Sequence, residues 1–334
     1  MYTATCPLEC RDCIVSASPR AQGKMTPETA LECIKIIPKY SDTVCFTGGE
    51  PMLYYNEILP LVREANALGL MVTMVTGCGW VRLEKEHIAR ERIFALKEAG
   101  LTTLCVSWDV YHEEFAPKEY PLLIIKLCKE AGIPVVVRGV IGASGEISNI
   151  KETLIQIEVP YQRAQLMRLG SAETLPDDHF AFNPTMEKLG GACSVINTPV
   201  VEYNGRVYAC CGPSRHSKSA ESPLVLGDIT KESLDSILYR SVRDPILEAI
   251  NTIGPLGVFR LMNEDPAMKD LLPVRAFYTG FCELCLDMFD IPDLVAKIRE
   301  RLSTADALRL LTAAKMFEQA DLEMKKMTYM NNFV

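Results

Sequence analysis

The chain has 334 residues, of which 48% are hydrophobic and 23% charged, so it is neither disordered nor fibrous and is long enough for about two domains. Its formal net charge of −8 argues against general nucleic-acid binding, which needs a basic face. No apolar run approaches the roughly 18 residues of a membrane span, and no signal-peptide core follows Met1. We therefore expect a cytoplasmic protein that binds neither nucleic acid nor membrane.

Short apolar strands alternate with amphipathic helices over residues 1–170, which we expect to form one domain. Thr26 and Pro27 are typical of a helix start, and Gly100 and Gly132 stand where later helices end. This alternation predicts right-handed βαβ units, a parallel sheet and hence an α/β fold, a partial (β/α)6 barrel. The predicted strands are Tyr2–Thr5, Thr43–Phe46, Met71–Thr76, Thr102–Ser107, Pro134–Val140 and Ala164–Leu169.

The pattern changes after residue 170. Residues 171–191 are predicted to be a linker, 192–290 a second domain and 291–334 a C-terminal helical segment, with one helix from Pro292 to about Tyr329. Asn204-Gly205 separates two strand-like runs, Thr198–Tyr203 and Arg206–Cys210, and an Asn-Gly pair in this position predicts a β-hairpin.

The 13 cysteines are the most informative residues. In a reducing compartment their spacing indicates metal or redox chemistry rather than disulfides. Five stand singly in apolar segments and are predicted to be small buried side chains: Cys33, Cys45, Cys78, Cys105 and Cys128. The other eight form two sets, Cys6, Cys10 and Cys13 in the first and Cys193, Cys210, Cys211, Cys282 and Cys285 in the second.

The first set has the spacing C-x3-C-x2-C, on the loop after the first predicted strand. A zinc ribbon would need a second cysteine pair to complete a tetrahedral site. Three thiolates on one tight loop instead suit three irons of a 4Fe–4S cluster, with the fourth iron left for a substrate or cofactor.

The triplet Cys6, Cys10 and Cys13 resembles the signature of radical S-adenosylmethionine (SAM) enzymes. In that family the open iron chelates the amino and carboxylate groups of SAM, and one electron from the cluster splits SAM into methionine and a 5′-deoxyadenosyl radical. One βα unit later, Gly48-Gly49-Glu50 is similar to the family's Gly-Gly-Glu element. The resemblance implies that the glycine backbone approaches the SAM amino group and that Glu50 accepts its hydrogen bonds.

Further polar residues fall at strand ends, where a parallel barrel places its active site. They are Thr76, Ser107, Asp109, Arg138 and Arg168, and all five are candidates for cofactor binding. The resemblance implies that Ser107 and Asp109 contact the ribose and methionine parts of SAM, and Arg168 its carboxylate. The alternative for each is a solvated strand end. His112 is close in sequence, but a single histidine defines no role.

The second set resembles the auxiliary-cluster appendages called SPASM or Twitch, which follow the barrel in many radical SAM enzymes. The resemblance implies one auxiliary 4Fe–4S cluster, so that the cofactors would be two such clusters and SAM. Its ligands would be Cys193, Cys210, Cys282 and Cys285, and a structural zinc ion at the same residues is the alternative.

Cys211 is then left over. Adjacent side chains of a strand point to opposite faces, so Cys211 is expected to face away from the cluster that Cys210 binds, toward the barrel mouth. A thiol there is able to donate a hydrogen atom to a carbon radical, which makes Cys211 the predicted catalytic residue. The alternative exchanges the two roles, with Cys211 as the ligand.

Within the family, the chain most resembles enzymes that epimerise L- to D-residues in ribosomally made, post-translationally modified peptides (RiPPs). The likeness lies in residues 107–112 and in residues 203–213 with their double cysteine. One departure is that Ser194–Pro199 lacks the carboxylate which those enzymes have after the first auxiliary cysteine. The alternatives are a radical SAM enzyme that forms a thioether or carbon–carbon crosslink and, in another class, a non-catalytic iron–sulfur carrier.

The implied partners are a precursor peptide and a reductant such as flavodoxin or ferredoxin. Five residues precede Cys6, so we expect peptide recognition to use the appendage, the helices from Pro292 or a separate protein.

Overall fold

The computed structural model describes residues 1–143, 148–181, 191–273 and 275–317. The chain divides into two compact units. The first contains Met1–Phe182, Val200–Val207 and Gly227–Leu238, and the second Asn183–Pro199, Tyr208–Leu226 and Tyr239–Val334. The predicted domain boundaries near residues 170 and 191 stay a prediction.

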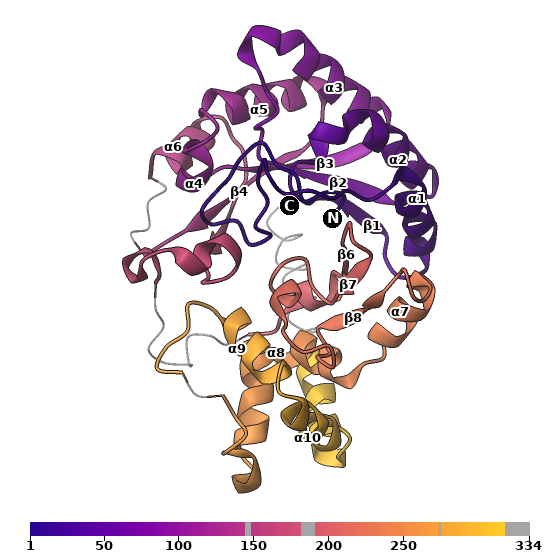
Figure 1. Cartoon of the computed structure of the whole chain (residues 1–334), viewed down its shortest axis with the longest axis vertical. Helices are drawn as coiled ribbons and strands as arrows, with labels where there is room; N and C mark the ends of the chain where they lie inside the picture. Colours follow the sequence, from indigo (N-terminus) through magenta and orange to yellow (C-terminus); the bar gives the residue numbers. More distant parts are fainter. Residues whose placement is uncertain (144–147, 182–190, 274, 318–334) are drawn as a thin grey trace, which may run out of the picture. The chain divides into compact units, whose positions relative to one another are not determined.

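The first unit is built on a parallel sheet with the strand order β1-β2-β3-β4-β5, so the predicted α/β fold is confirmed. Its strands are β1 Thr43–Phe46, β2 Met71–Thr76, β3 Leu101–Ser107, β4 Val135–Ile141 and β5 Tyr161–Gln165. Its helices are α1 Pro27–Ile36, α2 Tyr55–Ala67, α3 Glu86–Glu98, α4 Val110–Glu113, α5 Glu119–Ala131 and α6 Ser148–Gln156. Figure 1 shows the larger helices outside the sheet and the indigo N-terminal loop on its inner side.

Local chemistry explains where these helices begin and end. Thr26 caps α1 by accepting a hydrogen bond from the Thr29 amide, and Pro27 occupies the first turn. Gly132 ends α5 in the left-handed conformation, with φ of 69°. These predicted helix signals are confirmed.

Strand alternation separates a helix-covered face of the sheet from an open one. Val72, Met74, Leu104 and Val106 are buried against the helices. The odd-numbered positions of β1 and β3 point the other way, and there Cys45 is exposed and Cys105 half-buried. The predicted burial of Cys33, Cys78 and Cys128 is confirmed, whereas that of Cys45 and Cys105 is wrong, because their side chains point away from the face on which the buried residues of the sheet lie.

Two strand predictions need correction. Tyr2–Thr5 is not a strand of the sheet, because Thr3 and Thr5 pair only through isolated bridges, one of them parallel to Gly48. Their hydroxyls bond instead to the carbonyls of Gly23 and Ala21. The last strand is Tyr161–Gln165 rather than Ala164–Leu169, because an edge strand carries exposed polar residues that an apolar pattern misses.

A second, three-stranded sheet has the order β6-β7-β8, with β6 Val200–Val201, β7 Arg206–Tyr208 and β8 Val225–Asp228. The predicted hairpin is confirmed but shorter, since the Glu202 amide donates to the Arg206 carbonyl and Gly205 turns the chain with φ of 90°. The later helices are α7 Leu234–Ser241, α8 Pro245–Asn263, α9 Phe281–Phe289 and α10 Pro292–Leu302.

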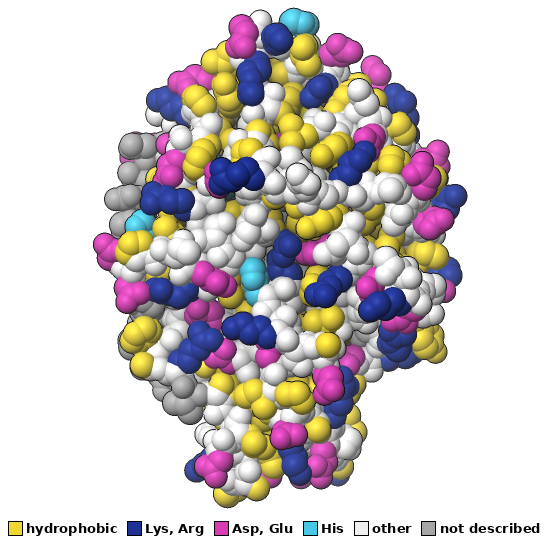
Figure 2. Space-filling model, in the orientation of Figure 1, with side chains coloured by type: hydrophobic (Ala, Val, Ile, Leu, Met, Phe, Trp, Pro, Cys, Tyr) yellow, Lys and Arg dark blue, Asp and Glu magenta, His cyan; other side chains and the backbone are white. Residues whose placement is uncertain are grey.

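The predicted C-terminal helix is broken. It stops at Leu302, where the Ser303 hydroxyl bonds to the Glu300 carbonyl, and a new helix occupies residues 305–317. The rest of that predicted helix, and residues 182–190 of the predicted linker, lie outside the described residues. No helix in the described ranges is long and apolar enough to cross a membrane. On the face shown in Figure 2, basic and acidic side chains are interspersed.

Candidate active site

The cysteine loop is held by backbone hydrogen bonds between the N-terminal segment and its neighbours. The Cys6 amide donates to the Ser18 carbonyl at 3.1 Å, and the Cys13 amide to the Cys10 carbonyl at 3.2 Å. The Leu8 amide points at Cys6 Sγ, 3.4 Å away. Burial raises the pKa of the Cys6 thiol to about 12 and that of Cys10 further still. Without a cation, these thiols therefore remain protonated.

The two glycines after β1 are required by the close passage of the N-terminal segment. The Gly49 amide donates to the Thr3 carbonyl at 2.7 Å. A Cβ atom at Gly48 would overlap the Thr3 carbonyl oxygen, and one at Gly49 that of Thr5. The Gly-Gly pair thus holds the cysteine loop against the end of β1, which is a structural reason for glycine that the sequence motif alone does not supply.

Glu50 is fully buried and bonded to the chain itself. Its carboxylate accepts hydrogen bonds from the Met52 amide at 3.1 Å, the Thr76 hydroxyl at 2.9 Å and the Gly77 amide at 3.0 Å. Burial raises its pKa to about 7, against the lowering effect of these hydrogen bonds. Glu50 and Thr76 therefore join the ends of β1 and β2 behind the cavity instead of lining it.

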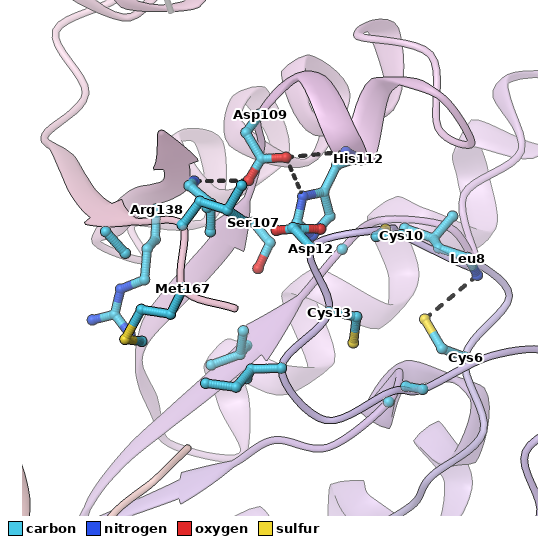
Figure 3. A pocket seen from close by; sticks show the side chains of 18 of the residues that line it. Cys6, Leu8, Cys10, Asp12, Cys13, Ser107, Asp109, His112, Arg138 and Met167 are labelled. Carbon is cyan, nitrogen blue, oxygen red and sulfur yellow. Dashed lines mark hydrogen bonds and ion pairs between the residues drawn. The ribbon is translucent and has the colours of Figure 1, made fainter. Parts of the chain in front are cut away.

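Asp109 is the centre of a buried hydrogen-bond network at the end of β3. Its Oδ1 accepts from the amides of Tyr111 and His112, both at 3.0 Å, and lies 2.7 Å from His112 Nδ1. Its Oδ2 accepts from the Val140 amide at 2.9 Å. The carboxylate thus caps α4 and orients the His112 ring, as Figure 3 shows. Burial lowers the pKa of His112, but Asp109 outweighs it and the pKa rises to about 9.

Asp12 adds a second buried carboxylate, inside the cysteine loop. It is 9% exposed, and its Oδ1 finds no hydrogen-bond partner among the described residues. Burial and then Asp109 raise its pKa to about 6. Polar atoms of Cys10, Asp12 and His112 lie within 4.8 Å of one another. Because buried acceptors are normally hydrogen-bonded, an N–H or O–H group of a ligand is a suitable donor to this oxygen.

These groups surround one cavity of about 280 Å³. The candidate residues in its wall are Cys6, Cys10, Cys13, Gly48, Gly49, Ser107, Asp109 and Arg138. Ser107 and Arg138 are register partners on β3 and β4, which brings them side by side. Figure 3 shows the Cys6 and Cys13 side chains reaching this space from the same loop.

Arg168 lies outside the cavity wall. Its guanidinium forms an ion pair with Asp177 and stacks 4.4 Å from the ring centre of Phe180. Sequence reasoning gave no role to Asp12, His112 and Met167, which do line the cavity. The signal for Asp12 was its position inside the cysteine loop, directly before Cys13. Nothing in the sequence marked Met167.

The second cysteine set converges within the second unit. Burial, and then the nearby thiols of Cys282, Cys210 and Cys193, raise the pKa of Cys285. The thiol of Cys211 has the same effect on Cys282. The four predicted ligands come from three segments: the turn before residues 194–197, the loop after β7, and the first turns of α9. These four thiols are a candidate ligand set for an iron–sulfur cluster, but among the described residues no three of them lie within 4.8 Å of one another, as the ligands of a single zinc ion would.

Cys210 and Cys211 differ in their surroundings, but not for the reason expected from strand alternation. β7 ends at Tyr208, so neither cysteine lies on a strand. A turn at Pro213–His216 follows, and its Ser214 bonds to Cys210. Cys210 is buried, whereas Cys211 is exposed.

Two family models match parts of the chain that contain Cys6, Cys10 and Cys13 and the first cysteines of the second set, but not Cys282 and Cys285. The radical SAM superfamily matches residues 1–154, and an iron–sulfur cluster-binding domain, SPASM, matches residues 193–252. None of the curated proteins matches the chain.

Among solved structures, SuiB of Streptococcus suis is similar at 15% identity and a TM-score of 0.40, covering 74% of this chain and 65% of that one. SuiB bound to its precursor peptide SuiA is similar at 13% identity and a TM-score of 0.39, covering 80% and 74%. This chain thus spans 65% of the length of the first of these structures.

The cavity fits an iron–sulfur cluster with SAM, which the radical SAM match implies. Three thiols, a carboxylate oxygen without a hydrogen-bond donor among the described residues and a glycine-lined wall meet there. Residues 1–154 are therefore a radical SAM domain and residues 193–252 a SPASM domain, which together imply SAM and two iron–sulfur clusters as the cofactors of this chain.

Proposed function

We propose that this chain is a radical SAM enzyme of RiPP biosynthesis that epimerises L-residues of a peptide to D-residues. The observation that carries the proposal is the contrast between two adjacent cysteines. Cys210 is buried near three other thiols, while Cys211, which also lies near that set, is exposed. A spare thiol is what inversion needs, since hydrogen must return to a carbon from which it was removed.

The cavity residues have separate tasks in this proposal. Cys6, Cys10 and Cys13 hold the first cluster, and Gly48, Gly49, Ser107 and Arg138 offer contacts to SAM. Asp12 Oδ1 provides a buried acceptor for a donor group of the ligand. Glu50 and Asp109, which accept hydrogen bonds from the chain's own donors, keep β-strand ends and the His112 ring in place. When bound, the cluster and SAM supply the radical that removes hydrogen from the peptide Cα.

Cys211 then completes the reaction. Its S–H bond breaks as a new Cα–H bond forms on the face opposite to the one that lost hydrogen. The sulfur radical left on Cys211 takes one electron from the external reductant, of the flavodoxin or ferredoxin class, and one proton from water. The thiol is restored and no atom is lost from the peptide.

One observation favours crosslinking as a second candidate. The helical turn Ser194–Asn197, after the first auxiliary cysteine, carries no carboxylate to handle a proton. A crosslinking enzyme removes two hydrogens from the peptide and has no use for a returning thiol.

Mass spectrometry separates the two. Candidate substrates are peptides encoded by any short reading frame found beside the gene for this chain, each incubated with SAM and reductant in ordinary and in deuterated water. We expect unchanged mass in ordinary water and a gain of one deuterium at Cα in deuterated water, because a thiol proton exchanges with solvent before transfer. A product lighter by two hydrogens and free of deuterium would remove epimerisation.

A further inference from the structure

Ser214 is a buried serine whose amide and hydroxyl contact one cysteine, while its carbonyl accepts from the Ser217 amide. It is 1% exposed and lies in the turn Pro213–His216, directly after the double cysteine. Its amide nitrogen lies 3.4 Å and its hydroxyl oxygen 3.2 Å from Cys210 Sγ. The same hydroxyl accepts from the Cys210 amide at 3.1 Å and donates to the Cys210 carbonyl at 2.9 Å. Ser214 therefore fixes both the backbone and the sulfur of Cys210.

The amide and hydroxyl of Ser214 are both able to donate to the Cys210 sulfur when it is a metal ligand. In the metal-free protein the Cys210 S–H donates to the Ser214 hydroxyl oxygen. A cluster binds thiolate, so that proton is released on metal binding. The serine hydroxyl is then free to turn its hydrogen from the Cys210 carbonyl to the thiolate. The Ser214 amide already points at the same sulfur, so the ligand has two donors available.

Donors at a ligand sulfur stabilise the reduced state of an iron–sulfur cluster, because that state carries one more negative charge. We propose that Ser214 is a positioning residue for the auxiliary cluster: it presents Cys210, rather than Cys211, as the ligand and raises the cluster's reduction potential. Its consequence for Cys211, which stays available as a hydrogen donor, rests on the proposed function.

The test measures the auxiliary cluster alone. Replacing Cys6, Cys10 and Cys13 with Ala removes the first cluster, so that the remaining cluster is titrated with a reductant and followed by electron paramagnetic resonance. In this background, Ser214→Ala is expected to lower the midpoint potential, whereas Ser214→Thr, which keeps the hydroxyl, retains the parent value. Ser222→Ala is the matched control, because Ser222 is equally buried in the same unit and its hydroxyl accepts from the Leu224 amide. Ser222→Ala is expected to leave the potential unchanged.

An unchanged potential in Ser214→Ala, or an equal shift in Ser222→Ala, would overturn the proposal. If Ser214→Ala loses the auxiliary iron altogether, Ser214→Thr must keep it. Iron lost from both variants would mean that packing at this position, and not the hydroxyl, holds Cys210, which also overturns the proposal. Neither SAM nor peptide is added, so the outcome is independent of whether the enzyme epimerises anything.

Discussion

The two cysteine sets of this chain, each of which is proposed to bind one iron–sulfur cluster, differ in architecture. The first lies within residues 6–13, on one loop whose own backbone hydrogen bonds shape it. The second spans residues 193–285 and needs three separate segments of the second unit to meet. A local set costs little chain entropy to assemble, whereas a dispersed set depends on the fold around it. The first site is therefore expected to be robust and the second sensitive to distant changes.

The largest effect is expected from the local set. Replacing Cys6, Cys10 and Cys13 together with Ala should lower the iron content from about eight to about four per chain, because one of two 4Fe–4S clusters is lost. Cleavage of SAM to 5′-deoxyadenosine under a chemical reductant should stop. Measurable 5′-deoxyadenosine from this variant would show that SAM is cleaved elsewhere.

Replacing a predicted ligand of the dispersed set should affect the second site and leave the first one active. Cys282→Ala is expected to lose about four irons while SAM cleavage continues, because the first cluster lies in the other unit. Iron analysis and 5′-deoxyadenosine formation, measured on the same sample, check this. Cys33→Ala is the control, since Cys33 is a buried thiol of α1 outside both sets, and it should keep all the iron. Loss of SAM cleavage in Cys282→Ala alone would contradict the independence of the sites.

A glycine exchange tests what holds the local loop. Gly49→Ala places a methyl group against the Thr5 carbonyl, so the N-terminal segment must move and SAM affinity should fall by about tenfold or more. Gly69→Ala is the comparison, because a Cβ there meets nothing within 4 Å and only its φ of 81° is unfavourable. Calorimetry with SAM should show normal binding for Gly69→Ala. Equal binding by both variants would mean that the close passage does not organise the site.

The smallest effect concerns the Asp109 network. Asp109→Asn removes charge and puts an amide group against donors, which should lower the free energy of unfolding by about 1–3 kcal/mol. Asp177→Asn, at an exposed carboxylate paired with Arg168, should change it by less than about 1 kcal/mol. Denaturant unfolding of both variants measures the difference. Equal values would mean that Asp109 contributes no more than a surface ion pair.

Sequence reasoning succeeded where the information is local. The helix cap at Thr26, the Asn204-Gly205 turn and the C-x3-C-x2-C loop are each defined by residues close together in the chain. It failed where tertiary packing decides. Cys45 was predicted to be buried but is exposed. The hydrogen bond of Glu50 to Thr76 of β2 is a further contact that the sequence did not predict, while its contact with SAM stays a prediction.

The division of Cys210 and Cys211 shows the same limit. Strand alternation predicted opposite directions for the two side chains, yet neither lies on a strand. What the structure shows is a difference of burial and partners, because Cys210 is buried and bonded to Ser214 whereas Cys211 is exposed. No pattern in the sequence marks that serine as a partner of the cysteine.

The central claim is that Cys210 is a ligand of the auxiliary cluster and Cys211 is not, and iron analysis of two neighbouring variants tests it most directly. Cys210→Ala is expected to fall from about eight irons to about four, while Cys211→Ala keeps about eight. The opposite result, with iron lost from Cys211→Ala and kept by Cys210→Ala, would exchange the two roles and contradict the account.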